Sequence, residues 1–147
     1  MTGSDFIVDL LIKQKVSDVF GIPGGVVLDF LYAMNRRPSK ITTHLNFHEQ
    51  NSVSSASGFA KASNNLGVAY ATRGPGITNM VTGVADAYCD SIPILIITGH
   101  SATLPENGMR VTYDQEIDVI KMFSGITKYA ERIDNIEDIR YKLEQAC

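Results

Sequence analysis

Two kinds of hydrophobic spacing alternate along this chain, one typical of amphipathic helices and one typical of short buried strands. Near the amino terminus, four apolar residues recur at helical spacing: Phe6, Ile7, Leu10 and Leu11. They follow Ser4, a residue type common at helix N-caps, so we predict a helix over about residues 4–15. A short buried strand is predicted next, at Val19-Phe20.

A glycine-rich turn ends this strand and leads into a second helix. The turn is Gly21-Ile-Pro-Gly-Gly25, and glycine and proline at this density interrupt regular structure. The helix that follows is marked by five apolar residues: Val26, Leu28, Phe30, Leu31 and Met34. We expect it to end before Pro38, because proline disfavours a helical conformation in the residue that precedes it.

The same order of strand, turn and helix is predicted three more times. The strands are Ile41–Leu45, which leads into a helix from Glu49, Gly67–Ala71, which leads into a helix after Gly76, and Ile94–Thr98, which leads into a long loop. Strands that alternate with helices of this length are typical of parallel βαβ units. The predicted fold class is α/β, with an open, mostly parallel sheet that carries helices on both faces in three layers, α/β/α.

The carboxyl-terminal segment predicts one more strand and one more helix. Ile126–Ala130 is predicted to supply a fifth strand, and Asn135 to cap a last helix whose first turn carries Glu137 and Asp138. No repeat, low-complexity tract or linker divides the sequence, so we assign residues 1–147 to a single domain. Because a parallel sheet gains a strand after each helix, we expect this domain to be a fragment of a longer multidomain enzyme.

The composition restricts the classes of protein to which the chain can belong. Of its 147 residues, 44% are hydrophobic and 20% are charged, which is enough apolar surface for a core and argues against disorder. The net charge is −3 and there is no basic run, so nucleic-acid binding is disfavoured. The longest apolar run, residues 92–97, is too short to cross a membrane, and the amino terminus does not resemble an export signal.

The two cysteines indicate a reducing compartment rather than a disulfide framework or a metal site. Cys89 and Cys147 lie far apart in the sequence, and neither belongs to a cluster with metal-ligand spacing. We therefore expect a cytoplasmic protein with no metal ligand in this chain. Cys89 follows Tyr88 in an apolar helical segment, where we expect it to be a buried small residue.

Four polar or glycine-rich segments are predicted to meet at the carboxyl ends of the strands, where open parallel sheets bind ligands. They are Gly21–Gly25, His48–Gln50, Thr72–Asn79 and the loop from Gly99 to Gln115. The sequence contains neither G-x-G-x-x-G nor G-x-x-x-x-G-K-[ST], which disfavours a nicotinamide-dinucleotide domain. The glycines themselves indicate either a ligand or simply tight turns.

Two further features leave alternatives open. His48 and Glu49 form a candidate acid–base pair, although a glutamate in the first turn of a helix also stabilises the helix dipole. Residues 51–63 are rich in serine, alanine and glycine, and small side chains allow a helix to pack closely. That helix is predicted to pack either on its own sheet or against another subunit.

Eight segments, taken together and in order, carry a resemblance to a known family. They are Gly21-Ile-Pro-Gly-Gly25, His48-Glu-Gln50, Gly58-Phe-Ala-Lys61, Thr72-Arg-Gly-Pro-Gly-Ile-Thr-Asn79, Gly83-Val-Ala-Asp-Ala87, Asp90-Ser-Ile-Pro93, Ile97-Thr-Gly99 and Gln115-Glu116. Together they cover nearly the whole chain. The set resembles the amino-terminal pyrimidine-binding domain of thiamine-diphosphate enzymes, and most closely that of the acetolactate synthase group.

The resemblance implies roles for individual residues. Glu49 matches the glutamate that hydrogen-bonds N1′ of the cofactor's aminopyrimidine and promotes the imino tautomer, which takes the proton from C2 of the thiazolium ring. Glu49 is therefore the predicted catalytic residue. The predicted cofactor-binding set comprises Pro23, Gly24, Gly25, Glu49, Thr72, Pro75 and Asn79. Gln115 matches a glutamine that faces the substrate.

The resemblance also implies cofactors and partners. The family binds Mg²⁺ and the diphosphate through a G-D-G…N motif in a separate domain, and residues 1–147 contain no such motif. The chain alone is therefore expected to bind thiamine diphosphate weakly and to be inactive. A diphosphate-binding domain of the same or another subunit would complete the site in a homodimer or tetramer. Some members also use FAD, bound by a domain that these residues do not include.

Two departures from the acetolactate synthase pattern bear on the substrate. Asp114 stands where these enzymes usually have phenylalanine, and the loop His100–Tyr113 differs from their usual sequence. The resemblance implies decarboxylation of a 2-keto acid such as pyruvate, followed by carboligation. The alternatives are a decarboxylase of a substituted pyruvate, such as phosphonopyruvate or sulfopyruvate, and a non-catalytic dimerisation or regulatory domain of the same fold.

Overall fold

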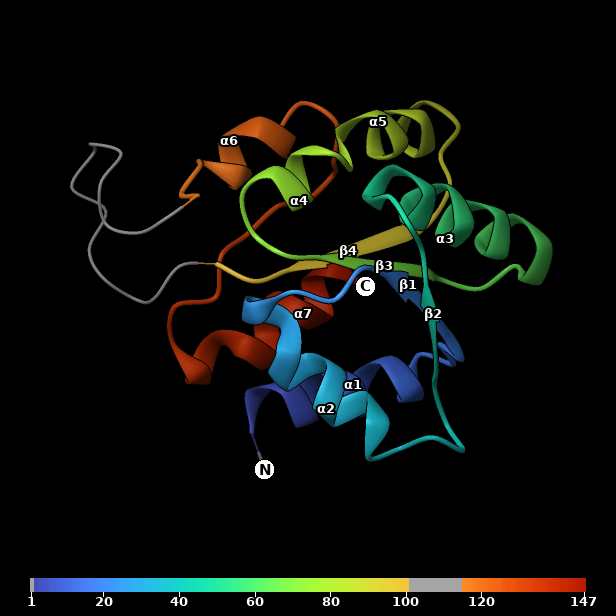
Figure 1. The fold of residues 1–147 in the computed structure, drawn as a ribbon, viewed down its shortest axis with the longest axis vertical. Helices are drawn as coiled ribbons and strands as arrows, with labels where there is room; N and C mark the ends of the chain where they lie inside the picture. Colours follow the sequence, from blue (N-terminus) through green and yellow to red (C-terminus); the bar gives the residue numbers. More distant parts are fainter. Residues whose placement is uncertain (1, 101–114) are drawn as a thin grey trace.

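A computed structural model of the chain describes residues 2–100 and 115–147, and its centre is a parallel sheet (Figure 1). The four strands are β1 (Asp18–Gly21), β2 (Thr42–Leu45), β3 (Gly67–Ala71) and β4 (Ile94–Thr98). They lie in the order β2-β1-β3-β4, and every neighbouring pair is parallel. Parallel strands direct all their carboxyl ends to one edge, so the turns that follow them gather there.

Helices cover both faces of this sheet, as the sequence predicts (Figure 1). One face carries α1 (Gly3–Lys13), α2 (Leu28–Asn35) and α7 (Ile139–Ala146), with the 3₁₀ turns η1 (Gly25–Val27) and η2 (Ile136–Asp138) leading into the last two. The other face carries α3 (Glu49–Ser63), α4 (Pro75–Thr78), α5 (Val81–Cys89) and α6 (Val119–Phe123). The three-layer α/β/α prediction is therefore confirmed.

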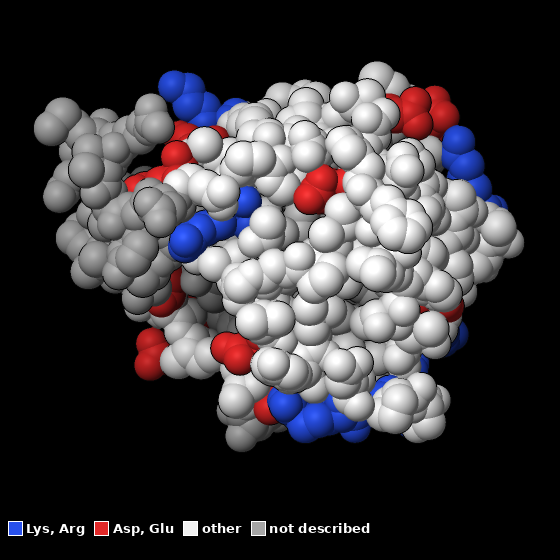
Figure 2. All heavy atoms as spheres, viewed as in Figure 1, with Lys and Arg blue, Asp and Glu red and all other residues white. Residues whose placement is uncertain are grey.

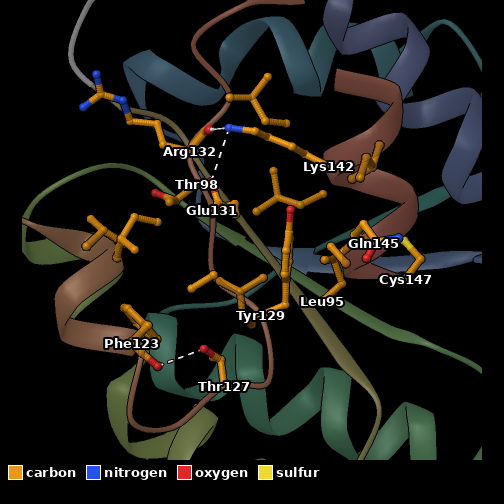
Figure 3. A pocket seen from close by; sticks show the side chains of 18 of the residues that line it. Leu95, Thr98, Phe123, Thr127, Tyr129, Glu131, Arg132, Lys142, Gln145 and Cys147 are labelled. Atoms are coloured by element: carbon orange, nitrogen blue, oxygen red, sulfur yellow. Dashed lines mark hydrogen bonds and ion pairs between the residues drawn. The ribbon is translucent and has the colours of Figure 1, made fainter. Parts of the chain in front are cut away.

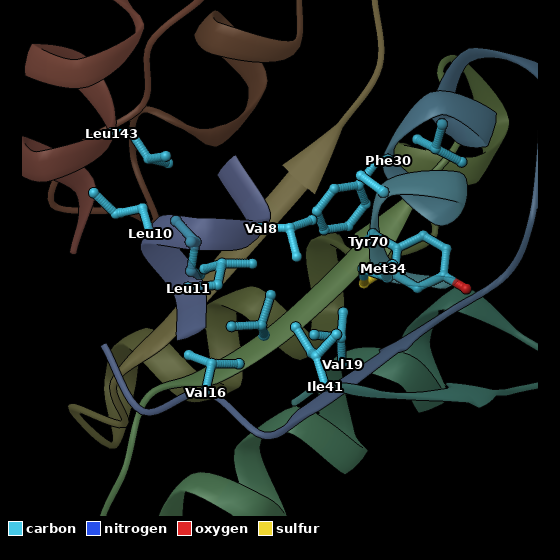
Figure 4. Packing of buried hydrophobic residues seen from close by; sticks show 14 residues of the cluster. Val8, Leu10, Leu11, Val16, Val19, Phe30, Met34, Ile41, Tyr70 and Leu143 are labelled. Atoms are coloured by element: carbon cyan, nitrogen blue, oxygen red, sulfur yellow. The ribbon is translucent and has the colours of Figure 1, made fainter. Parts of the chain in front are cut away.

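Each face of the sheet has its own hydrophobic core. The core under α1 and α2 includes Leu11, Met34 and Tyr70 (Figure 4), and the core under α3 and α5 includes Val53 and Met80. All five residues of β3 are buried, because β3 lies between two strands and under helices on both faces. A strand buried in this way must be apolar on both faces, which explains its uninterrupted apolar sequence.

Most of the predicted elements are present, with shifts at their ends. The first helix begins at Gly3, and its N-cap is Thr2 rather than the predicted Ser4. The Thr2 hydroxyl accepts a hydrogen bond from the backbone N–H of Asp5 at 3.1 Å, and the Asp5 carboxylate accepts one from the N–H of Thr2 at 3.1 Å. This reciprocal capping box satisfies two backbone donors at once, which is an advantage that Ser4 does not have.

Asp5 also joins the first two helices. Its carboxylate accepts hydrogen bonds from Arg36 at 2.6 Å and from Arg37 at 3.1 Å, and Arg37 in turn pairs with Asp9 at 2.7 Å. The Arg36 hydrogen bond, with the contributions of Thr2 and Arg37, holds the pKa of the Asp5 carboxyl well below its usual range. The α1–α2 pair is therefore fixed at its solvent side by charge and at its inner side by apolar packing.

Three predictions about the second half of the chain need correction. Ile126–Ala130 does not form a strand in the described structure, where no segment pairs with the outer edge of β4. The helix predicted after Gly76 is two helices, α4 and α5, separated at Asn79-Met80. Asn135 is an N-cap residue as predicted, but it caps the short η2 turn without a side-chain hydrogen bond, and α7 begins only at Ile139.

Cys89 is a further correction, because it is exposed rather than buried. The buried face of α5 carries Gly83, Val84 and Ala87, which face the sheet and α3. Cys89 is the last residue of α5 and lies beside Tyr88, whose side chain is also exposed. Both residues fall outside the helical stripe that faces the core.

The small residues of α3 allow this helix to pack closely on its own sheet and on α5. A Cβ added to Gly67 of β3 would overlap the backbone oxygen of Ala56, and one added to Gly83 of α5 would lie 2.8 Å from Val53. Of the two alternatives for this helix, packing on its own sheet is therefore confirmed. The opposite face, which includes Gly58 and Lys61, is exposed.

This packing predicts opposite effects for two glycine-to-alanine substitutions. Gly67→Ala introduces a methyl group where the Ala56 carbonyl lies, so we expect a loss of about 1–3 kcal/mol in the free energy of unfolding. Gly58→Ala is the matched control, because no atom lies within 4 Å of its added Cβ. Alanine favours the helix there, so a gain of about 0.5–1 kcal/mol is expected. Urea unfolding measures both, and an equal effect of the two substitutions would contradict the packing described.

Candidate functional site

The carboxyl ends of the strands bring together most of the residues that the sequence singles out. β1 ends at Gly21 and is followed by the turn to Gly25, β2 leads into α3 at Glu49, and β3 leads into Thr72 and α4. These segments lie far apart in the sequence, with a separation of 48 residues from Gly24 to Thr72 and of 30 from Glu49 to Asn79. The parallel sheet is what makes them neighbours (Figure 1).

The turns after β1 and β3 touch at Gly24 and Thr72. A Cβ added to Gly24 would lie 2.5 Å from Cβ of Thr72 and 2.6 Å from its hydroxyl oxygen, closer than real side chains approach. Gly24 has an extended backbone, with φ −165° and ψ 160°, so glycine is needed there for space and not for a left-handed conformation. The packing of the two turns therefore requires glycine at position 24, and the assignment of Gly24 to cofactor binding remains a prediction.

Gly25 and Pro23 present a more open part of the same turn. No atom lies within 4 Å of a Cβ added to Gly25, and both residues are exposed. Pro75 is also exposed and occupies the start of α4, where proline fits because the first helical N–H needs no partner. The assignment of these three residues to cofactor binding remains a prediction.

Thr72 also lies close to Gly76, which in turn lies close to Glu49. A Cβ added to Gly76 would lie 2.7 Å from the Thr72 methyl carbon and 3.5 Å from Oε1 of Glu49. Gly76 was not among the predicted site residues, although the Gly-Pro-Gly sequence was the signal that could have identified it. One contiguous row of contacts therefore crosses three turns, and its members are Gly24, Thr72, Gly76 and Glu49.

The local sequence holds Glu49 at the start of α3. His48 is the N-cap, with an extended backbone, and its Nδ1 accepts a hydrogen bond from the backbone N–H of Gln50 at 3.2 Å. His48 thus caps the helix, and this hydrogen bond goes to the backbone rather than to the Glu49 carboxylate. Glu49 lies in the first turn, where the helix dipole favours a negative charge, and its side chain is half-buried.

The two oxygens of the Glu49 carboxylate have different surroundings. Oε2 accepts a hydrogen bond from the side-chain amide of Asn79 at 2.9 Å. Oε1 is directed toward Gly76, where the absence of a side chain leaves space. One oxygen is therefore held by the protein while the other faces the turn, an arrangement that allows the carboxylate to exchange a proton with a bound group.

Gln115 lies against the same turn from a different segment. A Cβ added to Gly74 would lie 2.5 Å from Cβ of Gln115. Gly74 has a φ of 64° and Gln115 a φ of 60°, so both residues adopt the left-handed conformation that most side chains avoid. Gln115 therefore borders the Thr72–Asn79 turn. The predictions for Asp114 and for the loop after His100 fall on residues 101–114, which lie outside the described residues.

A further contact, which the sequence did not predict, joins the turn after β1 to the end of β4. Val26, in η1, lies directly over Gly99, where an added Cβ would overlap its side chain and its carbonyl oxygen. The turn after β1 therefore rests on the carboxyl ends of both β3 and β4. Nearby, burial raises the pKa of Tyr70, whose ring lies where a side chain on Gly21 would be.

Two further features are absent from the described residues. Within residues 2–100 and 115–147, no group of three or more His, Cys, Asp or Glu side chains is placed to bind a metal ion. In the same part of the chain, no helix is long and apolar enough to span a membrane. The candidate site thus consists of one half-buried carboxylate, its amide partner and a row of close turns.

Comparison with known proteins identifies the family. Residues 1–122 match the family described as thiamine pyrophosphate enzyme, N-terminal TPP binding domain. Acetolactate synthase 1, chloroplastic, of Oryza sativa subsp. japonica is 40% identical over 144 residues, covering 98% of this chain and 22% of that protein. The large subunit of acetolactate synthase isozyme 3 of Escherichia coli (strain K12) is 38% identical over 148 residues, covering 99% of this chain and 25% of that subunit.

A third relative, acetolactate synthase, chloroplastic, of Arabidopsis thaliana, is 38% identical over 144 residues and is matched over 21% of its length. The chain thus spans a quarter or less of the length of these relatives. The family match covers more than half of the chain and includes the turns that surround Glu49. The chain therefore belongs to the thiamine pyrophosphate enzymes, as an N-terminal TPP-binding domain similar to that of acetolactate synthases.

Proposed function

We propose that this chain supplies the pyrimidine-binding half of the active site of a thiamine-diphosphate enzyme that decarboxylates a 2-keto acid such as pyruvate and joins the product to an acceptor. The observation that carries this proposal is the Glu49 carboxylate, half-buried at the edge where the turns meet and held on one oxygen by Asn79. The similarity to acetolactate synthases supports the same reaction. Nothing in these relatives favours a phosphonopyruvate or sulfopyruvate decarboxylase.

The residues at this edge fit the aminopyrimidine end of the cofactor. Glu49 offers a carboxylate oxygen to a ring nitrogen, and the space at Gly76 allows a flat ring to approach it. The Gly24–Thr72 contact keeps the two flanking turns at a fixed separation. In this arrangement Glu49 orients the ring and holds the proton that moves to and from its nitrogen.

The cofactor, when bound, supplies the electron sink for loss of carbon dioxide from the keto acid. Residues 1–147 contain no G-D-G…N motif, with which the family is expected to bind Mg²⁺ and the diphosphate. On that resemblance, we propose that the Mg²⁺, the diphosphate and any FAD bind to other domains. Transferase or lyase activity belongs to the assembled protein.

The surface beside Glu49 supports a partner that completes the site. Leu45 is 63% exposed and Phe47 is 95% exposed, although both are large apolar residues. Leu45 precedes Glu49 by four residues and Phe47 by two. In the view of Figure 2, most side chains across the centre are uncharged, one acidic side chain lies among them, and most charged side chains lie toward the rim. We propose that a diphosphate-binding domain, in a homodimer or tetramer, covers this surface. The free thiols of Cys89 and Cys147 are consistent with a cytoplasmic location.

The central test replaces Glu49 by glutamine in the full-length gene product. Glutamine has the same shape but cannot exchange the proton, so we expect turnover of pyruvate to fall by about 100-fold or more. Steady-state kinetics with saturating thiamine diphosphate and Mg²⁺ provides the measurement. Glu137→Gln is the matched control, because Glu137 is an exposed carboxylate in η2 and its loss should leave turnover unchanged. Unchanged activity in Glu49→Gln would refute the proposed function.

A second substitution tests the hydrogen bond that holds Glu49. Asn79→Asp keeps the shape of the side chain but replaces the donor with a carboxylate at the 2.9 Å contact. Repulsion between two negative charges should turn the Glu49 side chain away, and we expect turnover to fall by about 10- to 100-fold. Asn79→Ala removes the donor without adding charge and should lose less.

Thermal unfolding separates the role of Asn79 from an effect on the fold. Asn79 is exposed, so both variants should unfold within a few degrees of the wild type. A wild-type turnover in Asn79→Asp would show that the Asn79–Glu49 hydrogen bond is not needed for the reaction.

A further inference from the structure

The hydrogen bond that caps α3 spans the backbone of Glu49. Nδ1 of His48 accepts this bond from the N–H of Gln50 at 3.2 Å, so the ring of atoms that it closes contains the backbone of Glu49. The carbonyl of His48 accepts a second hydrogen bond, from the N–H of Ser52 at 3.2 Å, and Ser52 is fully buried. His48 therefore fixes the backbone from which the Glu49 side chain leaves.

The two ends of Glu49 are held by different partners. The His48 cap spans its backbone, and the side-chain amide of Asn79 donates to Oε2 at 2.9 Å. Gly76 leaves space at the remaining oxygen, Oε1. A change in the backbone of Glu49 would redirect Oε1 even if the Asn79 contact were kept. The cap is therefore part of what directs the carboxylate.

The cap requires the neutral form of the His48 ring. A ring nitrogen that accepts a hydrogen bond carries no proton, so the single ring proton is on Nε2. Protonation of Nδ1 turns the acceptor into a donor, and the bond to the Gln50 N–H is lost. The usual N-cap residues are Ser, Thr, Asp and Asn. Histidine, in contrast, is the side chain that ordinarily changes charge between about pH 5 and 8.

A positive charge on His48 would also act on its surroundings. The N-terminus of a helix carries a partial positive charge, so an imidazolium is repelled there. Glu49, the next residue in the same turn, carries a negative charge and attracts it. Both effects favour an arrangement in which the Glu49 carboxylate turns toward His48 and away from Asn79.

The acidic groups in the neighbouring elements do not hold His48. Its side chain is exposed, and no acidic side chain forms an ion pair with it in the described part of the chain. Asp18 of β1 pairs with His44 at 2.6 Å. Asp90, which follows α5, pairs with Lys61 at 3.2 Å, near the other end of α3. The nearest acidic group along the chain is therefore Glu49 itself.

The other charged groups do not change this assignment. Asp86 of α5 is exposed and makes no ion pair with His48, and Arg73, in the turn before α4, has the same sign as a protonated ring. A cavity of about 900 Å³ beside β4 holds further charges (Figure 3). There Lys142 bonds to Glu131 at 3.3 Å, and His48 does not line that cavity.

We propose that His48 is a positioning residue for Glu49 that acts only while its ring is neutral. As the pH falls, protonation of His48 releases the cap, and activity is lost before Glu49 itself is protonated. The effect on the reaction rests on the proposed function. The release of the cap does not, because it requires only the hydrogen bond to Gln50.

Two substitutions of His48 in the full-length gene product separate the cap from the charge. Asparagine caps helices and does not titrate, so His48→Asn should keep kcat/KM within about threefold of the wild type at pH 8. At pH 5.5 it should exceed the wild type by about fivefold or more, because only the wild type loses the cap. His48→Ala has no acceptor and should lower kcat/KM about tenfold at pH 8.

His44→Asn is the matched control. His44 is a half-buried histidine of β2 that pairs with Asp18 and makes no contact with the cap of α3. Its pH profile should follow that of the wild type. The proposal would be overturned by a wild-type acid limb in His48→Asn, by wild-type activity of His48→Ala at pH 8, or by loss of the acid limb in His44→Asn as well.

The amide of Gln50 provides a measurement that needs no activity. In NMR spectra of the 147-residue chain, its resonance should shift as the pH falls, with the same midpoint as the His48 ring. In His48→Asn it should not shift in this range. A Gln50 amide that does not follow the His48 ring would overturn the proposal. If the full-length product does not turn over pyruvate, the proposed function fails, and this measurement still decides whether the cap is released.

Discussion

The close approach of the turns after β1 and β3 is the constraint on which the candidate site depends. Gly24 and Gly76 both lie against Thr72. A methyl group on Gly24 would force the two turns apart, whereas one on Gly76 would displace the Thr72 side chain within its own segment. Because Gly76 also borders Oε1 of Glu49, the same contacts determine how much space the carboxylate has. Packing between backbone segments, rather than a large pocket, therefore shapes this site.

The sheet converts a dispersed set of residues into this compact arrangement. Each strand is only four or five residues long, yet the shared direction of the strands places four turns at one edge. The small residues of α3 bring that helix down onto β3 and α5, and Glu49 stands at its first turn. The buried β3 strand, with a core on each side, is the rigid element to which both the helix and the turns are attached.

The sequence predicted the strands and the position of the site because both depend on local and periodic signals. Buried strands such as Gly67–Ala71 are continuous apolar runs, and glycine-rich turns mark their carboxyl ends. The ordered motifs then indicated Glu49, Thr72 and Asn79, which the structure brings together. The specific partner of each residue, such as Asn79 for Glu49, depends on tertiary geometry and could not be predicted from spacing.

The errors have physical causes of the same kind. α6 has five residues, too few to show a helical period, so it was not predicted. Ile126–Ala130 has the composition of a strand, but a strand needs a neighbour, and the described chain places none beside it. The burial of Cys89 was judged from its apolar neighbours, whereas its place at the last turn of α5 turns it outward.

The exposed position of Cys89 has a practical consequence. α5 runs back from the site, so this thiol lies near the amino ends of the strands, at the opposite edge of the sheet from Glu49. Once the other exposed thiol, Cys147, is replaced, a spectroscopic label or a surface tether attached at Cys89 would be held by a short, well-packed helix, away from the turns around Glu49. The fold thus separates an attachment point from the candidate site, which suits the domain to single-molecule and immobilised assays of assembly.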